Sequence, residues 1–288
     1  MRPALLVVGH GATSVEGAAE FAALVDRVQC RAPYADVAGG VFDLAAPAIE
    51  EAVERLIAAG HGSIDVVPLV LVAAGRSAGD IAAAFEAAML RHPGLSLRYT
   101  RPLGVHPDLL AVAQARLEQL LPLEQWADTA VVLVGPGTSD PDANAEIAKA
   151  ARLLQEGRGI GAVEASFSFL ARPSVPDGLD RAARLGFRRV VVLPWLLFAG
   201  ALPQQITEQA ATWAQEHPDV QVLQAGVIGP GEELAGVVLE RWAELDGGDL
   251  RMNCDTCAYR GSLPGDAGEV AAAHPHDHAH DHAHDHAH

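Results

Sequence analysis

The fold of this chain is decided by the stretch Leu5-Leu6-Val7-Val8-Gly9-His10-Gly11, a short apolar run that ends in glycines. Such a run is typical of a buried strand followed by a tight turn. Its glycine turn returns 126 residues later as Gly135-Pro136-Gly137, and Pro47, Gly60 and Pro68 recur at the same spacing as Pro173, Gly186 and Pro194. Four landmarks at one spacing predict two halves related by duplication.

Short β-branched runs alternate with longer helical stretches in both halves, the pattern of βαβ units around a parallel sheet. Strands are predicted over 5–8, 37–42, 64–71, 97–99, 130–134, 163–167, 190–195 and 220–223. Helices are predicted over 16–29, 47–59, 79–91, 107–120, 142–155, 175–185, 204–216 and 232–244. The expected fold class is α/β, with two duplicated βα-repeat halves that each hold a four-stranded parallel sheet flanked by helices.

The chain divides into four parts. Residues 1–126 and 127–245 form the two halves, 246–273 form a linker with a Cys-x-x-Cys segment, and 274–288 form a tail rich in His and Asp. The tail lacks the apolar residues of a core, so it is predicted to be disordered. The N-terminal half is expected to carry the chemistry, because Pro136 stands in the second half where His10 stands in the first.

Composition limits the classes of partner. The 288 residues include 20 Lys and Arg against 37 Asp and Glu, and this formal net charge of −17 argues against nucleic acid or a membrane surface. No apolar stretch has the length of a transmembrane helix, and the first residues do not resemble a signal peptide. The three cysteines fit metal or redox chemistry in a reducing compartment. A cytoplasmic monomer or homodimer is expected.

Three polar residues follow predicted strands of the first half. His10 follows the first strand, Asp43 the second and His106 the fourth. Ligands of open α/β sheets bind beyond the carboxyl ends of the strands, which form one edge. Imidazole and carboxylate suit divalent Co, Ni, Fe or Zn, so the three residues predict a metal site. The alternatives are turn hydrogen bonds for His10 and Asp43 and an N-terminal helix turn for His106.

A second motif favours a different class of enzyme. The stretch Gly75-Arg76-Ser77-Ala78-Gly79 fits a nucleophile elbow, which with Asp140 and His217 would make a serine hydrolase. We disfavour it because the elbow follows the third of eight strands and no candidate histidine follows a late strand. His61, His92 and His217 are expected to be solvated loop or helix-cap residues, and Cys30 a core residue.

The C-terminal region adds further metal ligands. Cys254 and Cys257 supply two of the roughly four ligands of a structural zinc or iron–sulfur site. A second subunit or the tail would complete it, and a pair of surface thiols is the alternative. Alternating imidazoles and carboxylates make the tail a flexible chelator of divalent metals. Its histidines are His274, His276, His278, His280, His282, His284, His286 and His288.

As a set, these residues resemble the long form of the sirohydrochlorin cobaltochelatase family, the CbiX-type class II chelatases, over nearly the whole chain. The cysteine segment and the tail also look like appendages of that long form. The motifs that carry the resemblance are Val8-Gly9-His10-Gly11, Phe42-Asp43-Leu44-Ala45, Val67-Pro68-Leu69-Val70-Leu71, Leu103-Gly104-Val105-His106-Pro107, Gly137-Thr138-Ser139-Asp140-Pro141-Asp142-Ala143-Asn144 and Leu193-Pro194-Trp195-Leu196-Leu197-Phe198.

The resemblance implies insertion of Co²⁺ into sirohydrochlorin, an octacarboxylate tetrapyrrole, without ATP and on the route to cobalamin. His10 matches the family's first histidine, Asp43 stands where Glu is common, and Arg76 stands where a second histidine is expected. The resemblance implies that His10 binds the metal and Asp43 receives pyrrole protons. His106 or a tail histidine would then be the second metal ligand.

The substrate that the resemblance implies is a polyanion and the protein is acidic, so a local basic pocket is expected. Guanidinium pairs bidentately with carboxylate, and Arg76, Arg101 and Arg172 are expected to bind the carboxylate arms. The resemblance also implies an iron–sulfur centre at Cys254 and Cys257 of a bridged dimer. The alternatives are a sirohydrochlorin ferrochelatase for siroheme and a degenerate chelatase that acts as a cobalt or nickel chaperone.

Overall fold

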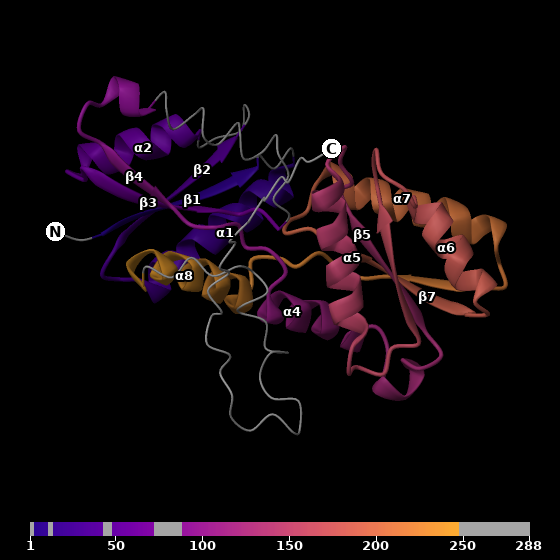
Figure 1. Ribbon diagram of the computed structural model, residues 1–288. Helices are drawn as coiled ribbons and strands as arrows, with labels where there is room; N and C mark the ends of the chain where they lie inside the picture. The colour runs from indigo at the N-terminus through magenta and orange to yellow at the C-terminus, as the bar shows by residue number, and fades with distance from the viewer. Residues whose placement is uncertain (1–2, 11–13, 43–47, 72–87, 248–288) are drawn as a thin grey trace, which may run out of the picture.

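The computed structural model describes residues 3–10, 14–42, 48–71 and 88–247, and it contains two parallel four-stranded sheets (Figure 1). The first sheet has the order β2-β1-β3-β4 and the second the order β6-β5-β7-β8. The strands are β1 (Ala4–His10), β2 (Asp36–Phe42), β3 (Ser63–Pro68), β4 (Ser96–Tyr99), β5 (Ala130–Gly135), β6 (Ala162–Phe167), β7 (Arg189–Pro194) and β8 (Gln221–Gln224). The α/β class and all eight predicted strands are confirmed.

Helices cover both faces of each sheet. They are α1 (Val15–Arg31), α2 (Ile49–Ala58), α4 (Pro107–Glu118), α5 (Pro141–Gln155), α6 (Val175–Arg184), α7 (Ala201–Glu216) and α8 (Glu232–Gly247), with a 3₁₀ turn at Leu123–Gln125. The predicted helix over 79–91 lies mostly outside the described residues, and its described end, 88–91, is helical. Within the described residues, no helix is long and apolar enough to span a membrane.

The strand β3 is shorter than predicted. Its register with β1 runs out at Pro68, which pairs with Val8. The N–H of Leu69 still donates to the carbonyl oxygen of Val8 at 2.7 Å, and the chain then turns, since the N–H of Val70 donates to the carbonyl oxygen of Pro68 at 2.9 Å. The apolar run 69–71 therefore belongs to the loop at the carboxyl edge of the sheet, and it was included in the predicted strand because it is apolar.

Alternate residues of a central strand face two different cores. Leu5 and Val7 of β1 belong to a continuous apolar core that also includes residues of β5 and β7. Leu6 and Val8 face a second core formed with α2. Successive side chains of a strand point to opposite faces, so a strand buried on both faces is a continuous apolar run. This is why the opening stretch of sequence predicts the sheet.

The backbone repeats at the spacing seen in the sequence. A lone bridge joins Val41 to Ala48 after β2, and the matching bridge joins Phe167 to Ser174 after β6, 126 residues later. Gly60 and Gly186 precede β3 and β7 with φ of 96° and 97°. Both turns need a left-handed residue, which only glycine adopts without strain. The duplication is thus a property of the backbone as well as of the sequence.

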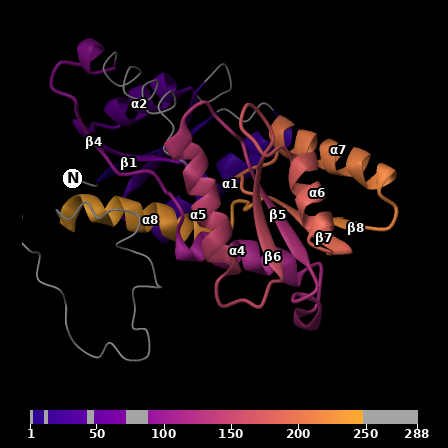
Figure 2. The same ribbon diagram turned by 45° about the vertical axis from the view of Figure 1, so that its right-hand side comes forward.

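The last helix of each half packs across the boundary between the halves. Figures 1 and 2 show α8 beside the first sheet, where it contacts α1, α4 and β3, whereas α4 contacts α5. The indole N–H of Trp242 in α8 donates to Asp65 of β3 at 2.7 Å, and its ring stacks on Tyr34. The sequence segments 1–126 and 127–245 therefore exchange their terminal helices.

Two arginines bind the exchanged helices to the other half in the same way. Arg241 of α8 donates to the carbonyl oxygens of Pro102 and Leu103, at 3.2 and 2.8 Å. Arg116 of α4 donates to the carbonyl oxygens of Val227 and Ile228, both at 2.9 Å. Each pair of carbonyls lies in the loop after the last strand of the other half. The packing between the halves is thus reciprocal.

Candidate functional site

One predicted site residue of the first half, His10, lies at the end of a strand. His10 is the last residue of β1 and pairs in register with Phe42, the last residue of β2. Asp43 follows Phe42 directly in the sequence and, like Arg76, lies outside the described residues. The backbone therefore brings His10 beside the residue that precedes Asp43.

The second half contacts the first close to this edge. The N–H of Ala199 donates to Glu20 of α1 at 2.6 Å, and the hydroxyl of Ser14 donates to the carbonyl oxygen of Ala199 at 3.4 Å. Phe21 and Phe198 pack edge to face with ring centroids 6.2 Å apart. The N-cap residue of α1, Ser14, four residues after His10, thus lies against the loop that precedes α7.

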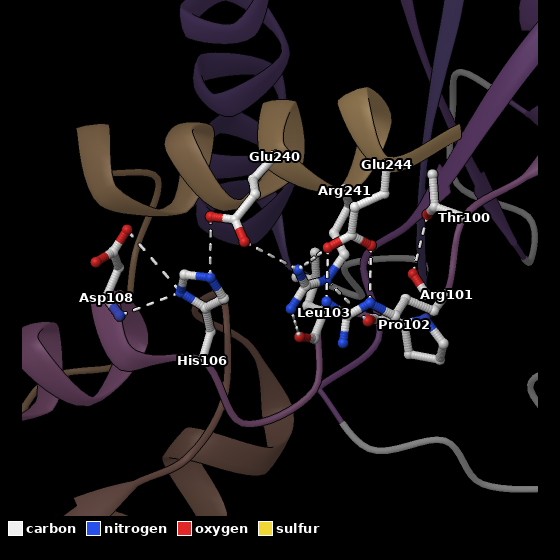
Figure 3. Close-up of polar contacts among 9 residues, drawn as sticks. All are labelled: Thr100, Arg101, Pro102, Leu103, His106, Asp108, Glu240, Arg241 and Glu244. Carbon is white, nitrogen blue, oxygen red and sulfur yellow. Dashed lines mark hydrogen bonds and ion pairs between the residues drawn. The ribbon is translucent and has the colours of Figure 1, made fainter. Parts of the chain in front are cut away.

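His106 caps a helix (Figure 3). Its Nδ1 accepts from the N–H of Asp108 at 3.1 Å, and its Nε2 lies 3.2 Å from a carboxylate oxygen of Glu240. Because Nδ1 accepts, the neutral ring carries its proton on Nε2 and donates it to Glu240. Its side chain is 5% exposed. Protein groups engage both ring nitrogens, so the structure favours the helix-turn alternative for His106 over metal binding.

Arg101 is engaged inside the protein. It donates from Nε and Nη2 to the two carboxylate oxygens of Glu244, at 2.7 and 2.6 Å, and the two side chains are 11% and 13% exposed. Burial raises the pKa of Glu244, but hydrogen bonds from Arg101 and the charge of Arg241 outweigh burial and lower it. Arg101 therefore holds α8 to the segment that follows β4, and its Nε and Nη2 donate to Glu244.

Arg172 lies on the surface. Its side chain is 78% exposed and donates to Asp177 at 2.8 Å. It follows Phe169 and Leu170, two large apolar side chains that are 59% and 70% exposed at the carboxyl end of β6. Of the three predicted substrate arginines, Arg172 is the one whose described side chain is open to a ligand.

The described residues hold no group of three or more His, Cys, Asp or Glu side chains suited to a metal ion. The loops after β1 and β2, the segment with Arg76, the cysteines Cys254 and Cys257 and the eight tail histidines all lie outside the described residues. Of the predicted metal ligands, the structure therefore describes the backbone of His10 and the whole of His106.

The remaining histidines serve local contacts. His61 is buried and lies 2.7 Å from Asp36, so the expectation of a solvated residue is wrong here. His92 lies 2.7 Å from Glu54, and His217 stacks on Trp213. Cys30 is exposed, which corrects the expectation of a core residue.

The hydrolase alternative receives no support from the described residues. Asp140 caps the start of α5, just after the carboxyl end of β5. His217 caps the end of α7, just before the amino end of β8. An acid and a base at opposite edges of one sheet cannot share a catalytic triad, since its members must be within hydrogen-bond reach.

Sequence reasoning missed the groups that join the halves. Glu244 binds Arg101, and Arg241 binds the loop after β4. Both Glu244 and Arg241 come from the far end of the chain. A signal was present in the register of the repeat, because Arg116 and Arg241 lie near corresponding positions of the last helices of the two halves. The partners of these arginines follow only from the packing of the helices.

Comparison with known proteins gives matches along both halves. The family model CbiX matches residues 4–120 and 130–245. A sirohydrochlorin cobaltochelatase of Priestia megaterium is 33% identical over 262 residues, which cover 89% of this chain and 84% of the relative. A sirohydrochlorin ferrochelatase of the same organism is 32% identical over 218 residues, which cover 74% and 81%.

Solved structures agree with the fold. The sirohydrochlorin chelatase SirB from Bacillus subtilis subspecies spizizenii, in complex with cobalt, superposes with a TM-score of 0.70 at 25% identity, covering 85% of this chain and 95% of the other. SirB from Bacillus subtilis with Fe³⁺ gives a TM-score of 0.73 at 26% identity, covering 86% and 98%.

Proposed function

The chain belongs to the CbiX family, and we propose that it is a chelatase that inserts Co²⁺ into sirohydrochlorin, without ATP, on the route to cobalamin. The observation that carries the proposal is the match to a cobaltochelatase at 33% identity over 89% of the chain. The register of β1 with β2 supports the site, because it sets His10 beside the residue before Asp43.

In this proposal the two polar residues divide the reaction. The imidazole of His10 offers a lone pair to Co²⁺ and releases it to the pyrrole nitrogens of the ring. Two N–H protons must leave the ring as the dication enters, which keeps the net charge of the ring unchanged. Asp43 is the proposed proton acceptor, since carboxylates serve as general bases and Asp43 directly follows β2 in the sequence.

Arginines bind the carboxylate arms of the substrate in this proposal. The formal charge of −17 gives no general attraction for a polyanion, so the attraction must be local. Arg172 is exposed beside β6 and supports this role, and Arg76 is proposed from its sequence position alone. We do not include Arg101, because its guanidinium binds Glu244 on two edges.

The C-terminal region is assigned an accessory role. Cys254 and Cys257 offer two thiolates, half of the ligands that an iron–sulfur cluster takes, so the donor set of one chain does not fit a cluster and no step involves one. The tail histidines are proposed to collect divalent metal. A cytoplasmic reaction and a monomer or homodimer remain the expectations of the sequence.

The proposal is tested by mixing the protein with sirohydrochlorin and Co²⁺ in the absence of air and following the absorbance of the ring. Insertion faster than the uncatalysed reaction, and lost in His10→Ala, is expected. A rate of metal insertion equal to that of the uncatalysed reaction would contradict the proposal. Wild-type rate in His10→Ala would instead remove His10 from the site.

The second candidate is a sirohydrochlorin ferrochelatase, which the similarity to relatives of that name at 32% and 27% identity favours. Imidazole and carboxylate bind Fe²⁺ as well as Co²⁺, and ligand type alone separates these metals poorly. The same assay with Fe²⁺ and Co²⁺ at equal concentration distinguishes the two. A higher kcat/KM for Fe²⁺ would assign the protein to siroheme synthesis.

A further inference from the structure

Helix α1 leads from the predicted metal site of the first half to the second half. Its N-cap residue, Ser14, follows His10 by four residues, so the Cα atoms of these two residues are at most about 14 Å apart. Near its start α1 contacts the loop before α7, and at its end it contacts the start of α8. The position of His10 relative to the second half therefore depends on how α1 is held.

Two side chains near the start of α1 bind both backbone groups of one residue, Ala199. The carboxylate of Glu20 accepts from its N–H at 2.6 Å, and the hydroxyl of Ser14 donates to its carbonyl oxygen at 3.4 Å. We call Ser14, Glu20 and Ala199 the clamp. Phe21 packs edge to face on Phe198 beside it. The hydrogen bond to Glu20 is the stronger of the two, because a carboxylate acceptor gives shorter and stronger bonds than neutral groups do.

The loop that carries Ala199 is anchored within the second half. The N–H of Trp195 donates to a carbonyl oxygen of β5 at 2.8 Å. The carbonyl oxygen of Leu196 accepts from the N–H of Ile228 at 2.9 Å, and the next carbonyl oxygen accepts from the next N–H at 2.7 Å. These bonds fix the loop to its own sheet and to the loop after β8. The clamp therefore joins α1 to the body of the second half.

The other end of α1 is held independently of the clamp. Arg27 donates to the carboxylate of Glu232 at 2.6 Å, and Arg31 donates to the backbone carbonyl oxygen of Glu232 at 2.9 Å. Between them and the clamp, Leu24 is buried in the core that includes residues of both sheets. Loss of the clamp would therefore release the end of α1 that lies close to His10, while the core and the other end keep the halves together.

The duplication retains the helix cap and the carboxylate of the clamp. Asp140 and Glu146 lie 126 residues after Ser14 and Glu20, and Asp140 caps α5 as Ser14 caps α1. The predicted site residues His10, Asp43 and Arg76 instead have apolar counterparts, which are Pro136, Phe169 and Leu202. Contact between the halves is a task that both halves share, whereas the metal chemistry is expected of the first half alone. The repeat thus groups Glu20 with the contacts between the halves.

We propose that Glu20 is a positioning residue for metal insertion, because its hydrogen bond to Ala199 fixes the second half relative to the metal ion on His10. This rests on the function proposed above, in which His10 of the first half binds the metal and Arg172 of the second half binds a carboxylate arm. Each half then holds one reactant. Misplacement of reactants by about 1 Å can slow a reaction about 100-fold. Glu20 acts through Ala199 and touches neither the metal nor the ring.

The test compares Glu20→Ala and Glu20→Gln with the control Glu16→Gln, which removes an exposed carboxylate from the first turn of the same helix. In Glu20→Ala, kcat for Co²⁺ insertion should fall about tenfold or more at saturating substrates. KM for sirohydrochlorin and the Kd of Co²⁺ from calorimetry should stay within about twofold of wild type, because no contact to either reactant is removed. Glu20→Gln should restore most of kcat, since its amide oxygen accepts the same hydrogen bond. Glu16→Gln should keep the wild-type kcat.

Hydrogen exchange at the N–H of Ala199, measured by NMR, reports on the clamp without the reaction. Exchange should be slow in the wild-type protein and in Glu20→Gln, and faster in Glu20→Ala. Unchanged exchange in Glu20→Ala would overturn the clamp itself. Faster exchange with a wild-type kcat would overturn the positioning role and leave the proposed function standing.

The remaining outcomes separate the hydrogen bond from other causes. A fall of kcat in Glu20→Gln as large as in Glu20→Ala would show that the hydrogen bond is not the cause and overturn the proposal. An equal fall in Glu16→Gln would assign the effect to lost negative charge and overturn it too. A wild-type protein that inserts no metal, with exchange as expected, would overturn the proposed function and the positioning role together.

Discussion

Glu244 is enclosed by two arginines that come from different parts of the chain. It accepts two hydrogen bonds from Arg101 and one from Arg241 at 2.9 Å, and Arg241 is fully buried. Burial lowers the pKa of Arg241 and the positive charge of Arg101 lowers it further, whereas Glu244 opposes both effects. Glu244 therefore pairs with both guanidinium groups, and Glu240 adds a second carboxylate 3.5 Å from Arg241.

Replacing Glu244 by Gln is expected to destabilise the protein by about 3 kcal/mol, because removing one partner of a buried pair leaves charge without compensation. Urea unfolding at neutral pH measures the change. The control is Glu233→Gln, which alters an exposed carboxylate of the same helix and should stay within about 0.5 kcal/mol of wild type. Equal stability of the two variants would contradict the role of Glu244.

Asp43 is the proposed acceptor of the pyrrole protons, and its replacement tests that role. Asp43→Asn removes the proton acceptor and keeps the size of the side chain, so insertion of Co²⁺ should slow about 100-fold at saturating substrate. Binding of metal-free sirohydrochlorin should change little. Asp142→Asn, an exposed carboxylate in the first turn of α5, is the control for a loss of negative charge. A rate within about twofold of wild type would exclude Asp43 as the acceptor.

At the scale of elements, α6 begins with a capping box. Ser174 accepts from the N–H of Asp177, and Asp177 accepts from the N–H and hydroxyl of Ser174 and from Arg172. The backbone N–H of Ser174 contributes most to lowering the pKa of Asp177 from 3.8 to about 2, followed by its hydroxyl and Arg172. The helix start thus depends on an ionised carboxylate that also binds Arg172.

This pKa makes the contribution of Asp177 dependent on pH. A folded-state pKa below the unfolded value stabilises the folded protein above the unfolded pKa, and the stabilisation disappears as pH falls through the folded value. Asp177→Asn should therefore lower the free energy of unfolding by about 1 kcal/mol or less near pH 7, because the site is open to solvent. This loss of stability should become smaller as the pH falls from about 4 to about 2. Urea unfolding across that range measures it. A cost independent of pH would contradict the assignment.

At the scale of the whole molecule, the exchange of α4 and α8 joins the two halves. The main core includes Leu5 of β1, Leu133 of β5 and Val238 of α8. Neither half can bury its inner face without a helix of the other. The two sheets are therefore expected to unfold together, although the sequence divides near residue 126.

A single urea transition is the expected result. Trp242 reports on α8 against the first sheet and Trp213 on α7 against the second, and both are buried. Circular dichroism and the fluorescence of variants that keep one of these tryptophans should give coincident midpoints, as in a two-state reaction. Two separate midpoints would show that the exchanged helices do not couple the halves.

The strands, most helix spans and the duplication followed from the sequence alone. Apolar runs, glycines and prolines act within a few residues of themselves, so their pattern determined β1 to β8 and the spacing of 126 residues. The position of His10 at the end of β1 followed for the same reason. The loops with Asp43 and Arg76 stay predictions.

Only the tertiary structure decided how the elements are shared between the halves. His106 binds Glu240 and Arg101 binds Glu244, although more than 130 residues separate each pair. No local pattern specifies such partners, because they depend on which helix covers which sheet. The exposure of Phe169 likewise depends on what the rest of the chain leaves uncovered. The sequence by itself therefore determined the repeating unit, and the packing of exchanged helices decided which polar residues join the halves and which side chains remain free to meet a ligand.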